Sequence, residues 1–303
     1  MFVDAYTHKF LTIRDMSEMT LIDTAFASTF LSTTSFSSPL GKEDAEHLVI
    51  SIRGTDKQVM VPARPTSQWL KDNTTLERVD IWDYDTDGYI YADSINDTFT
   101  SFFSRKVKLV YKGPEKRTLR GNGAPHLLGR EESTNFPDVM PLLIANEASI
   151  KELNGRLKEK GHKEIGVERF RPNIIVRGSE REGDGRPRAW EEDSWKTVRI
   201  VNGEETEGSG FVGLLGGGET GLTIDVQARC ARCQVPNVDP ETAEKDKHEP
   251  WDTLVSYRRI DEGIKWKPCF GMLGAGRGTG DVRVGMKFEV IEETGSHKYV
   301  KGF

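Results

Sequence analysis

Two of the chain's three cysteines lie in the segment "RCARCQVPNVDP", residues 229–240, and their spacing could serve several kinds of chemistry. Cys230-x-x-Cys233 is half of a four-ligand zinc site, but only Cys269 and scattered histidines remain to complete it. A redox-active pair normally stands at the start of a helix, whereas two prolines follow Cys233 closely. Two partly buried cysteines without chemistry, or a ligand for a different metal, are the remaining interpretations.

Two other motifs match known binding loops only in part. "DYDTDG", Asp83 to Gly88, begins like a calcium-binding EF-hand loop, but Ser94 stands where a bidentate glutamate is required. We therefore expect an acidic turn between a strand and a helix there. "GGGETG", ending at Gly221, has the glycine spacing of a dinucleotide-binding loop, but strand-like sequence follows it. We expect a hairpin tip at this place and predict no NAD or FAD in this chain.

The composition is typical of an intracellular globular protein. A length of 303 residues favours two domains, and a net charge of −6 argues against a nucleic-acid partner. Three cysteines imply no disulfide framework, which fits a reducing compartment. No apolar run approaches the roughly 18 residues of a membrane span. The first residues also lack the basic start and apolar run of a signal peptide.

Strands outnumber helices among the expected elements. Strand-like sequence occurs at 47–54, 78–82, 106–112, 173–177 and 222–229. One helix is predicted at 93–105, with Asp93 or Ser94 as its N-cap. A second is predicted at 147–161, with Ser149 and Glu152 as a capping box and Gly161 as its end. The sequence therefore predicts a mainly β protein with a few helices, an α+β chain with barrel-like sheets.

A basic stretch runs from Arg105 to Arg130 and contains eight lysines and arginines but a single acid, Glu115. Such a stretch is usually a solvated loop. Because Arg117 and Arg120 are concentrated beside glycines, an alternative is a docking site for an acidic partner protein.

The residues around the cysteine pair resemble the MOSC domain, and more narrowly the amidoxime-reducing component proteins and the C-terminal domain of molybdenum cofactor sulfurases. The shared pattern is a cysteine, a Val-Asp-Pro turn, Glu-Pro and Leu-x-x-Tyr-Arg, here Cys233, residues 238–240, 249–250 and 254–258. Further similar segments are "FPDVMPLLIANEASIKELNGRL" (136–157), "FRPNIIV" (170–176) and "EDSW" (192–195). The resemblance covers nearly the whole chain. It implies a MOSC-type β-barrel domain at 121–303 and an N-terminal MOSC-associated β-rich region at 1–120.

The resemblance implies a molybdenum–pterin cofactor (molybdopterin). The cysteine directly before the Val-Asp-Pro segment, Cys233, is the implied metal ligand and catalytic residue, whereas Cys230 is not expected to bind the metal. Arg229 and Arg232 flank Cys233 and are expected to favour its thiolate form. Arg232 is therefore also a candidate cofactor-binding residue.

The remaining site residues also come from the resemblance. Asp138 is the second implied catalytic residue, which would orient a substrate amidine or relay a proton. The pterin phosphate needs fixed donors. The implied donors are Arg14, Arg171 and Asn173.

The implied function is a molybdenum-dependent oxidoreductase that reduces small N-hydroxylated substrates such as amidoximes. Its electrons would come from a separate protein, of the type of cytochrome b5 with its reductase, because no second redox centre is evident here. The alternative is a carrier module for cofactor or sulfur of the sulfurase type, although no pyridoxal phosphate-binding desulfurase domain is expected. A third alternative is a pterin-binding protein without enzymatic activity. The expected location is intracellular, either cytoplasmic or peripheral to mitochondria.

The beginning of the chain differs from the pattern implied by the resemblance. The similar proteins open with a strand that carries a "PIKS"-like segment, and "MFVDAYTHKFLTIR" corresponds to the strand after it. We therefore expect an N-terminally shortened chain, without a membrane anchor, that binds the cofactor weakly because cofactor contacts are lost.

Overall fold

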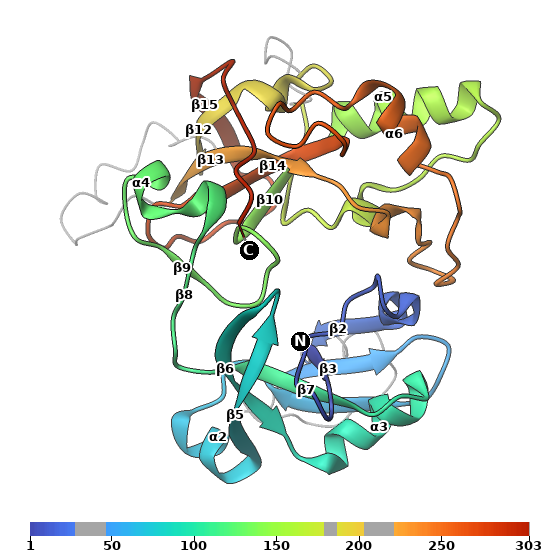
Figure 1. Ribbon diagram of the computed structural model, residues 1–303, viewed down its shortest axis with the longest axis vertical. Helices are drawn as coiled ribbons and strands as arrows, with labels where there is room; N and C mark the ends of the chain where they lie inside the picture. Colours follow the sequence, from blue (N-terminus) through green and yellow to red (C-terminus); the bar gives the residue numbers. More distant parts are fainter. Residues whose placement is uncertain (28–46, 179–186, 203–220, 303) are drawn as a thin grey trace, which may run out of the picture. The chain divides into compact units, whose positions relative to one another are not determined.

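The computed structural model describes residues 1–27, 47–178, 187–202 and 221–302. The chain divides into two units (Figure 1). The first comprises Met1–Arg117 and Val238–Asp246, and the second comprises Thr118–Asn237 and Lys247–Phe303. The chain therefore returns to the first unit shortly after Cys233. Most of the glycine-rich segment before Gly221, where a hairpin tip was expected, lies outside the described residues.

The first unit is built from strands and two helices. Its strands are β1 (Phe2–Asp4), β2 (Ile22–Phe26), β3 (His47–Ile52), β4 (Gln58–Pro62), β5 (Thr74–Ile81), β6 (Tyr84–Tyr91) and β7 (Val107–Lys112). Its helices are α2 (Ser67–Asn73) and α3 (Asp93–Phe103), with the 3-10 turn η1 (Ser17–Leu21). The strands form two antiparallel sheets, with the orders β1-β7-β6-β5 and β2-β3-β4. Helix α3 packs Phe99 against Phe2, with ring centroids 4.9 Å apart, and so closes the core of this unit.

The Val-Asp-Pro turn is held in the first unit by Arg53, which follows β3. The Arg53 guanidinium binds both carboxylate oxygens of Asp23 on β2, at 2.6 and 3.0 Å. Its remaining Nη1 donates to the carbonyl oxygen of Pro240 at 2.9 Å and lies 3.1 Å from the Glu241 carboxylate. One planar, five-donor group thus ties the turn to two strands.

The second unit contains a larger sheet with the order β11-β10-β14-β13-β12-β15. Its strands are β10 (Leu142–Asn146), β11 (Ile174–Val176), β12 (Trp195–Val201), β13 (Gly221–Ala231), β14 (Cys269–Gly276) and β15 (Lys287–Glu293), with the short β8 (Arg117–Thr118) and β9 (Ser133–Thr134) alongside. Its helices are α4 (Pro125–Leu128), α5 (Glu147–Glu159) and α6 (Trp251–Tyr257), and its 3-10 turns are η3 (Gly121–Gly123), η4 (Val167–Phe170), η5 (Glu191–Ser194) and η7 (Val235–Asn237). Only the β10–β11 pair of the large sheet is parallel.

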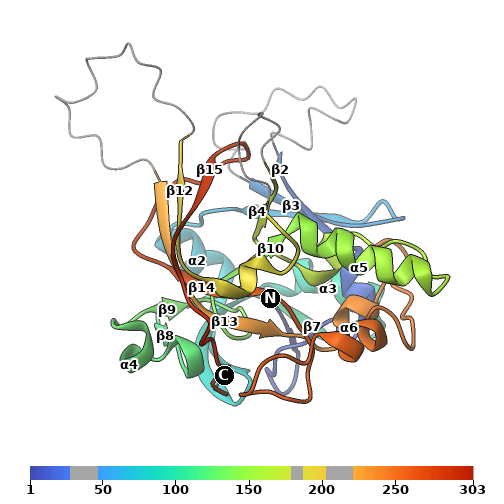
Figure 2. The same cartoon turned by 90° about the horizontal axis from the view of Figure 1, so that it is seen from above.

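Helices α5 and α6 of the second unit lie beside one another, whereas α4 lies apart from them (Figure 2). The apolar stripe of α5, Ile150, Leu153 and Leu157, meets Leu254 of α6 and Phe270 of β14. The 3.6-residue period that predicted this helix therefore also selects its buried face. None of the helices in the described ranges is long and apolar enough to cross a membrane.

The expectation of a mainly β protein with a few helices is confirmed, but the N-terminal caps predicted for both helices are wrong. Helix α3 follows Ala92, which makes no side-chain capping bond. Helix α5 is capped by Asn146, whose side chain accepts the N–H of Ala148. Ser149 instead donates to Glu192 at 2.8 Å, and Glu152 accepts from Trp190 at 3.1 Å. The two side chains of the predicted capping box therefore bind residues distant in the sequence and do not cap the helix.

Two further expectations are also corrected. The stretch "DYDTDG" is not a turn, because from Tyr84 onward it forms β6 and pairs with β5 along its whole length. β7 lies at the predicted strand 106–112, but the rest of the basic stretch, up to Arg130, is not an open loop, because it contains β8, η3 and α4. Arg117 is only 3% exposed and stacks on Tyr84 at 5.7 Å, so it cannot present its charge to a partner.

Candidate functional site

The cysteine pair lies where β13 leaves the large sheet. Ala231 is the last residue of the strand and pairs with Cys269 on β14. One more ladder-like bond follows, from the Arg232 N–H to the carbonyl oxygen of Pro268 at 2.8 Å. Opposite Cys230, the register shifts at Gly271, whose φ of +76° is in the left-handed region. A bulge of this kind bends the sheet and aims the side chains near it.

Cys230 and Arg232 share one face of this extended segment. The Arg232 Nη1 donates to the Cys230 sulfur at 2.9 Å, and Cys230 also packs near Val139 and Leu143. Because the segment is extended, the Cα atoms of Cys230 and Cys233 are expected about 10 Å apart, beyond the reach of a disulfide. Both thiols are free, and both are partly exposed. The geometry therefore disfavours the redox-active pair considered from the sequence.

Arg232 is a buried cation, with only 8% of its surface exposed. Its Nη2 donates to the carbonyl oxygen of Phe170 at 2.9 Å, and the guanidinium lies 5.4 Å from the Phe170 ring. Within the described part of the chain it has no carboxylate partner, and its Nε lacks a hydrogen-bond acceptor. A buried charge is costly unless it is paired. Arg232 is thus suited to hold an anionic group beside the cysteines.

Arg171 directly follows Phe170, whose carbonyl oxygen binds Arg232, and Asn173 is two residues further along the chain. Arg171 is exposed and ends η4 with a φ of +58°, an uncommon conformation for a residue other than glycine. The Asn173 side-chain oxygen accepts the Leu143 N–H at 2.8 Å, and its backbone N–H donates to the Leu143 carbonyl at 2.8 Å. The side-chain oxygen of Asn173 is therefore used to align the chain, which leaves its Nδ2 for a ligand.

Asp138 precedes β10 and is half-buried, next to Val139 in the cluster that contacts Cys230. Tyr299 lies in the same region. Burial raises the pKa of Tyr299 to about 12, and the charges of Cys230, Asp138 and Asp261 contribute to the shift. Asp138 is thus brought to the side of the second unit where Cys230 lies.

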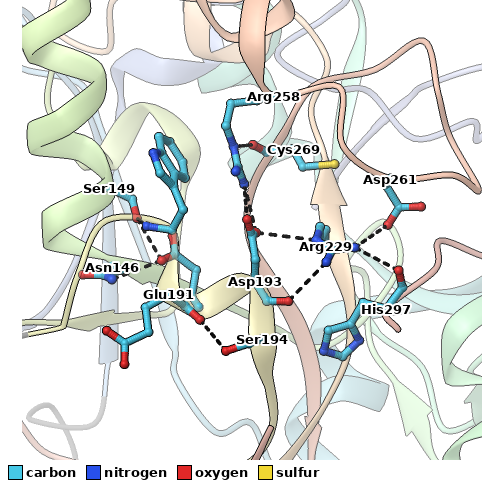
Figure 3. Close-up of polar contacts among 12 residues, drawn as sticks. Asn146, Ser149, Glu191, Asp193, Ser194, Arg229, Arg258, Asp261, Cys269 and His297 are labelled. Carbon is cyan, nitrogen blue, oxygen red and sulfur yellow. Dashed lines mark hydrogen bonds and ion pairs between the residues drawn. The ribbon is translucent and has the colours of Figure 1, made fainter. Parts of the chain in front are cut away.

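A buried network of charges supports the strand that carries the cysteines (Figure 3). Asp193, in η5, binds Arg258 at 2.8 Å and lies 3.7 Å from the Nε of Arg229. Arg229 continues to Asp261 at 3.5 Å and to the His297 carbonyl oxygen at 2.9 Å. Two arginines and two aspartates thus balance each other in the interior, as buried ion pairs require. The network fixes Arg229, the residue directly before Cys230.

Arg258 also reaches the third cysteine, because its Nε donates to the carbonyl oxygen of Cys269 at 3.1 Å. The Cys269 thiol is fully buried, and this burial, with the nearby Asp261 charge, raises its pKa to about 12. Cys269 is therefore a neutral core residue and unsuited to bind a metal as a thiolate.

Arg14 belongs to the first unit. It is exposed, follows β1 by ten residues, and lies 5.1 Å from the ring centroid of Trp82. Trp82 and Asp83 form the left-handed turn between β5 and β6. The indole of Trp82 thus holds the Arg14 guanidinium beside this turn.

The sequence predicted some of these residues and missed others. Arg229 and Arg232 were expected to flank Cys233, but Arg232 points to the Cys230 sulfur and Arg229 points to the aspartates. "EDSW" and Tyr-Arg were noticed as similar segments, which was the one signal for Asp193 and Arg258. Asp261 and Tyr299 carried no signal, because only the folded chain brings them to the cysteine strand.

Comparisons with known proteins identify the family of the chain. The MOSC domain family matches residues 131–289. A Danio rerio protein named mitochondrial amidoxime-reducing component 1 is 30% identical over 68% of this chain and 54% of its own length. A Bos taurus protein named mitochondrial amidoxime reducing component 2 is 27% identical over 81% and 67%. An Arabidopsis thaliana molybdenum cofactor sulfurase is 34% identical over 59% of this chain and 19% of its own length. The matched region thus spans about half to two thirds of the animal relatives, and the chain belongs to the MOSC domain family.

Proposed function

We propose that this protein is a molybdenum-cofactor-dependent oxidoreductase that reduces small N-hydroxylated compounds of the amidoxime type. The observation that carries the proposal is the buried Arg232 guanidinium, which has no carboxylate partner in the described residues and stands directly before the partly exposed Cys233. A soft thiolate ligand beside a fixed cation suits a cofactor that combines a thiophilic metal with anionic groups. Membership of the MOSC family and the names of the relatives support the same choice.

The donor set fits this cofactor. Cys233 would supply the thiolate, and Arg232, with its acceptor-lacking Nε, would bind an anionic group of the pterin. Arg171 and the Nδ2 of Asn173 adjoin Arg232 through Phe170 and are the proposed donors to the pterin phosphate. Arg14, in the first unit, is proposed as a further phosphate donor. When bound, the cofactor would supply two-electron redox chemistry at the metal.

Asp138 is proposed to orient the substrate and to carry a proton. Reduction of an amidoxime consumes two electrons and two protons, and it yields an amidine and one water. A carboxylate can bind the amidine nitrogen atoms through charge-assisted hydrogen bonds and can also relay a proton to the leaving oxygen. Its place beside Val139, which packs in the same cluster as Cys230, supports this role.

The electrons are proposed to come from a separate protein, of the kind of cytochrome b5 with its reductase. We propose an intracellular location, cytoplasmic or peripheral to mitochondria, and the word "mitochondrial" in the names of the relatives supports it. A cofactor or sulfur carrier of the sulfurase type is the second candidate, and the 34% identity to the plant sulfurase favours it.

Metal analysis of two cysteine variants tests the proposal. Cys233→Ala is expected to lose nearly all molybdenum when the protein is made in a host that supplies the cofactor, because the thiolate ligand is gone. Cys230→Ala is the matched control and should keep close to the parent's metal content. Loss of the metal from Cys230→Ala together with its retention in Cys233→Ala would overturn the ligand assignment.

An activity assay separates the two candidate functions. A loaded parent chain supplied with a reducing system should convert benzamidoxime to benzamidine. A chain with a full complement of molybdenum that never reduces benzamidoxime would instead be a carrier.

A further inference from the structure

The segment from Arg259 to Lys267, which we call the basic-aromatic loop, exposes an unusual set of side chains. Trp266 is 80% exposed and stands between Lys265 and Lys267, while Ile260 is 40% exposed. Arg259 and both lysines are exposed, and none of them has an ion-pair partner within the described ranges. The segment also contains the exposed Glu262 and the buried Asp261, so its exposed side chains carry three positive charges and one negative charge, in a chain whose net charge is −6.

Hydrogen bonds and an ion pair of Asp261 hold the loop against the buried network and the C-terminal segment. Asp261, which lies 3.5 Å from Arg229, accepts the backbone N–H of Gly263 at 2.8 Å and that of Tyr299 at 2.9 Å. Gly263 lies so close to Tyr299 that an added Cβ would be 1.9 Å from the Tyr299 carbonyl oxygen. The neighbours of Tyr299 therefore adjoin the loop, and Lys298 among them is exposed. They enlarge the basic surface.

Such a surface is suited to bind a partner rather than water alone. An indole leaves a large apolar area in contact with water when it is exposed. Tryptophan and arginine are the residues that most often carry the binding energy of protein interfaces. Cations around an apolar centre attract an acidic partner and speed its association. The chemistry of the loop thus fits a protein with an acidic face.

The loop also leads directly to the cysteines. Trp266 is two residues before Pro268, whose carbonyl oxygen accepts the Arg232 N–H at 2.8 Å, and Cys233 follows Arg232. A partner seated on Trp266 would therefore be separated from the proposed metal ligand by a few residues. Electron transfer requires a short path of this kind, whereas a membrane surface at the same place would have no use for it.

We propose that the basic-aromatic loop is the docking surface for an acidic electron-donor protein, a role that rests on the proposed function. A haem donor carries one electron, so two reduced donor molecules are oxidised for each amidoxime. Two protons enter, the N–O bond breaks, and amidine and water leave. Arg117, which the sequence suggested as a docking residue, is buried and cannot contact a partner. The basic-aromatic loop is therefore proposed in its place.

The test compares a loop variant with a matched control in the full, cofactor-loaded chain. The loop variant combines Trp266→Ala with Lys265→Glu and Lys267→Glu. The control combines Lys158→Glu with Lys163→Glu, which changes the charge equally. These control lysines lie at the end of α5, where Lys160 contacts Thr253 near the beginning of α6, and the basic-aromatic loop follows the opposite end of α6.

Benzamidoxime reduction is measured with two electron sources, cytochrome b5 with its NADH-dependent reductase, and reduced methyl viologen. We expect the loop variant to lose at least tenfold in kcat/KM for cytochrome b5, with an increased KM, and to keep the parent's rate with methyl viologen. The control should match the parent with both sources. Equal losses in the two variants, or an unchanged rate in the loop variant, would overturn the proposal.

Binding measurements keep the docking proposal separate from the proposed function. If the parent reduces nothing with either source, the proposed function fails. The docking surface is then judged by titration calorimetry with cytochrome b5, in which the loop variant should bind at least tenfold more weakly than the control. Sedimentation with phosphatidylserine vesicles that depends on Trp266, without any effect on cytochrome b5 binding, would assign the loop to a membrane surface and overturn the proposal.

Discussion

At the scale of single residues, the buried carboxyl groups of the second unit have two kinds of neighbours, arginines or neutral polar side chains. Asp193 lies 2.8 Å from Arg258, and Asp261 lies 3.5 Å from Arg229. Glu192 is fully buried, and its Oε2 accepts hydrogen bonds from Ser149 at 2.8 Å and Asn146 at 3.1 Å. Both of these partners are neutral. Burial raises the pKa of Glu192 to about 7.

The raised pKa of Glu192 predicts a pH-dependent stability that Glu192→Gln should remove. Below about pH 4 the carboxyl is protonated in both states, and its stabilising effect is fully present. As the pH rises through about 7, the unfolded state gains by releasing the proton, so the parent loses roughly 3 kcal/mol of unfolding free energy through this group. The glutamine resembles the protonated acid, and its stability relative to the parent should increase by that amount between pH 4 and pH 8.

Urea unfolding at a series of pH values measures this difference. Glu159→Gln is the control, because Glu159 is exposed at the end of α5 and meets water in both states. A Glu192→Gln variant whose stability differs from the parent by a constant amount at every pH would contradict a neutral Glu192.

Cys233, Arg232, Arg171 and Asn173 could be named from the sequence, because they lie in short segments with a recognisable pattern. The partner of Arg232 could not, since its contact with Phe170 joins residues 62 positions apart. The pairing of Asp193 with Arg258 spans 65 positions in the same way. Local patterns thus indicate candidate site residues, whereas long-range packing decides what each of them contacts.

At the scale of elements, the bulge at Gly271 positions the cysteine strand. A Cβ added at Gly271 would lie 2.8 Å from the carbonyl oxygen of Ile144, and the φ of +76° is unfavourable for any L-residue with a side chain. Gly155, in α5, has open space around it and an ordinary helical conformation. Replacement by alanine is therefore hindered at Gly271 and unhindered at Gly155.

Gly271→Ala is expected to lower the free energy of unfolding by about 2 to 4 kcal/mol, through backbone strain and the clash with β10. Gly155→Ala is expected to raise it by about 0.5 to 1 kcal/mol, because alanine loses less entropy in a helix. Urea unfolding of both variants checks the pair. A Gly271→Ala variant as stable as the parent would show that the bulge adapts and does not fix the strand.

The elements themselves were largely predictable, and so was the end of α5 at Gly161, whereas the N-terminal caps of α3 and α5 were not. The apolar positions of α5 recur at the helical period, and the alternation in β3 marks one buried face, so both were expected. The capping box was wrong because Ser149 binds Glu192, 43 residues further along the chain. The strand at "DYDTDG" was missed because Asp87 and Gly88, rare in strands, are accepted where Lys112 pairs with Asp87 and Val110 fills the space beside Gly88.

At the scale of the whole molecule, the source of the electrons follows from where the sulfur atoms lie. Reduction of one amidoxime needs two electrons, and two thiols can provide two electrons only by forming a disulfide. The segment that carries Cys230 and Cys233 is a strand up to Ala231, so we expect their Cα atoms about 10 Å apart. Cys269 is buried with a raised pKa. The three thiols of this chain therefore cannot serve as its electron store.

The loaded chain is accordingly expected to form no benzamidine from benzamidoxime when NADH is its only reductant. With cytochrome b5 and its reductase added, product should accumulate over many turnovers, and one NADH should be consumed for each benzamidine, because both represent two electrons. Chromatography of the product and absorbance of NADH measure the two quantities. The control is the Cys233→Ala chain with the complete donor system, which is expected to carry almost no molybdenum and to form no product. Sustained turnover by the parent with NADH alone would mean that the chain accepts hydride itself, and the requirement for an external donor would then be wrong.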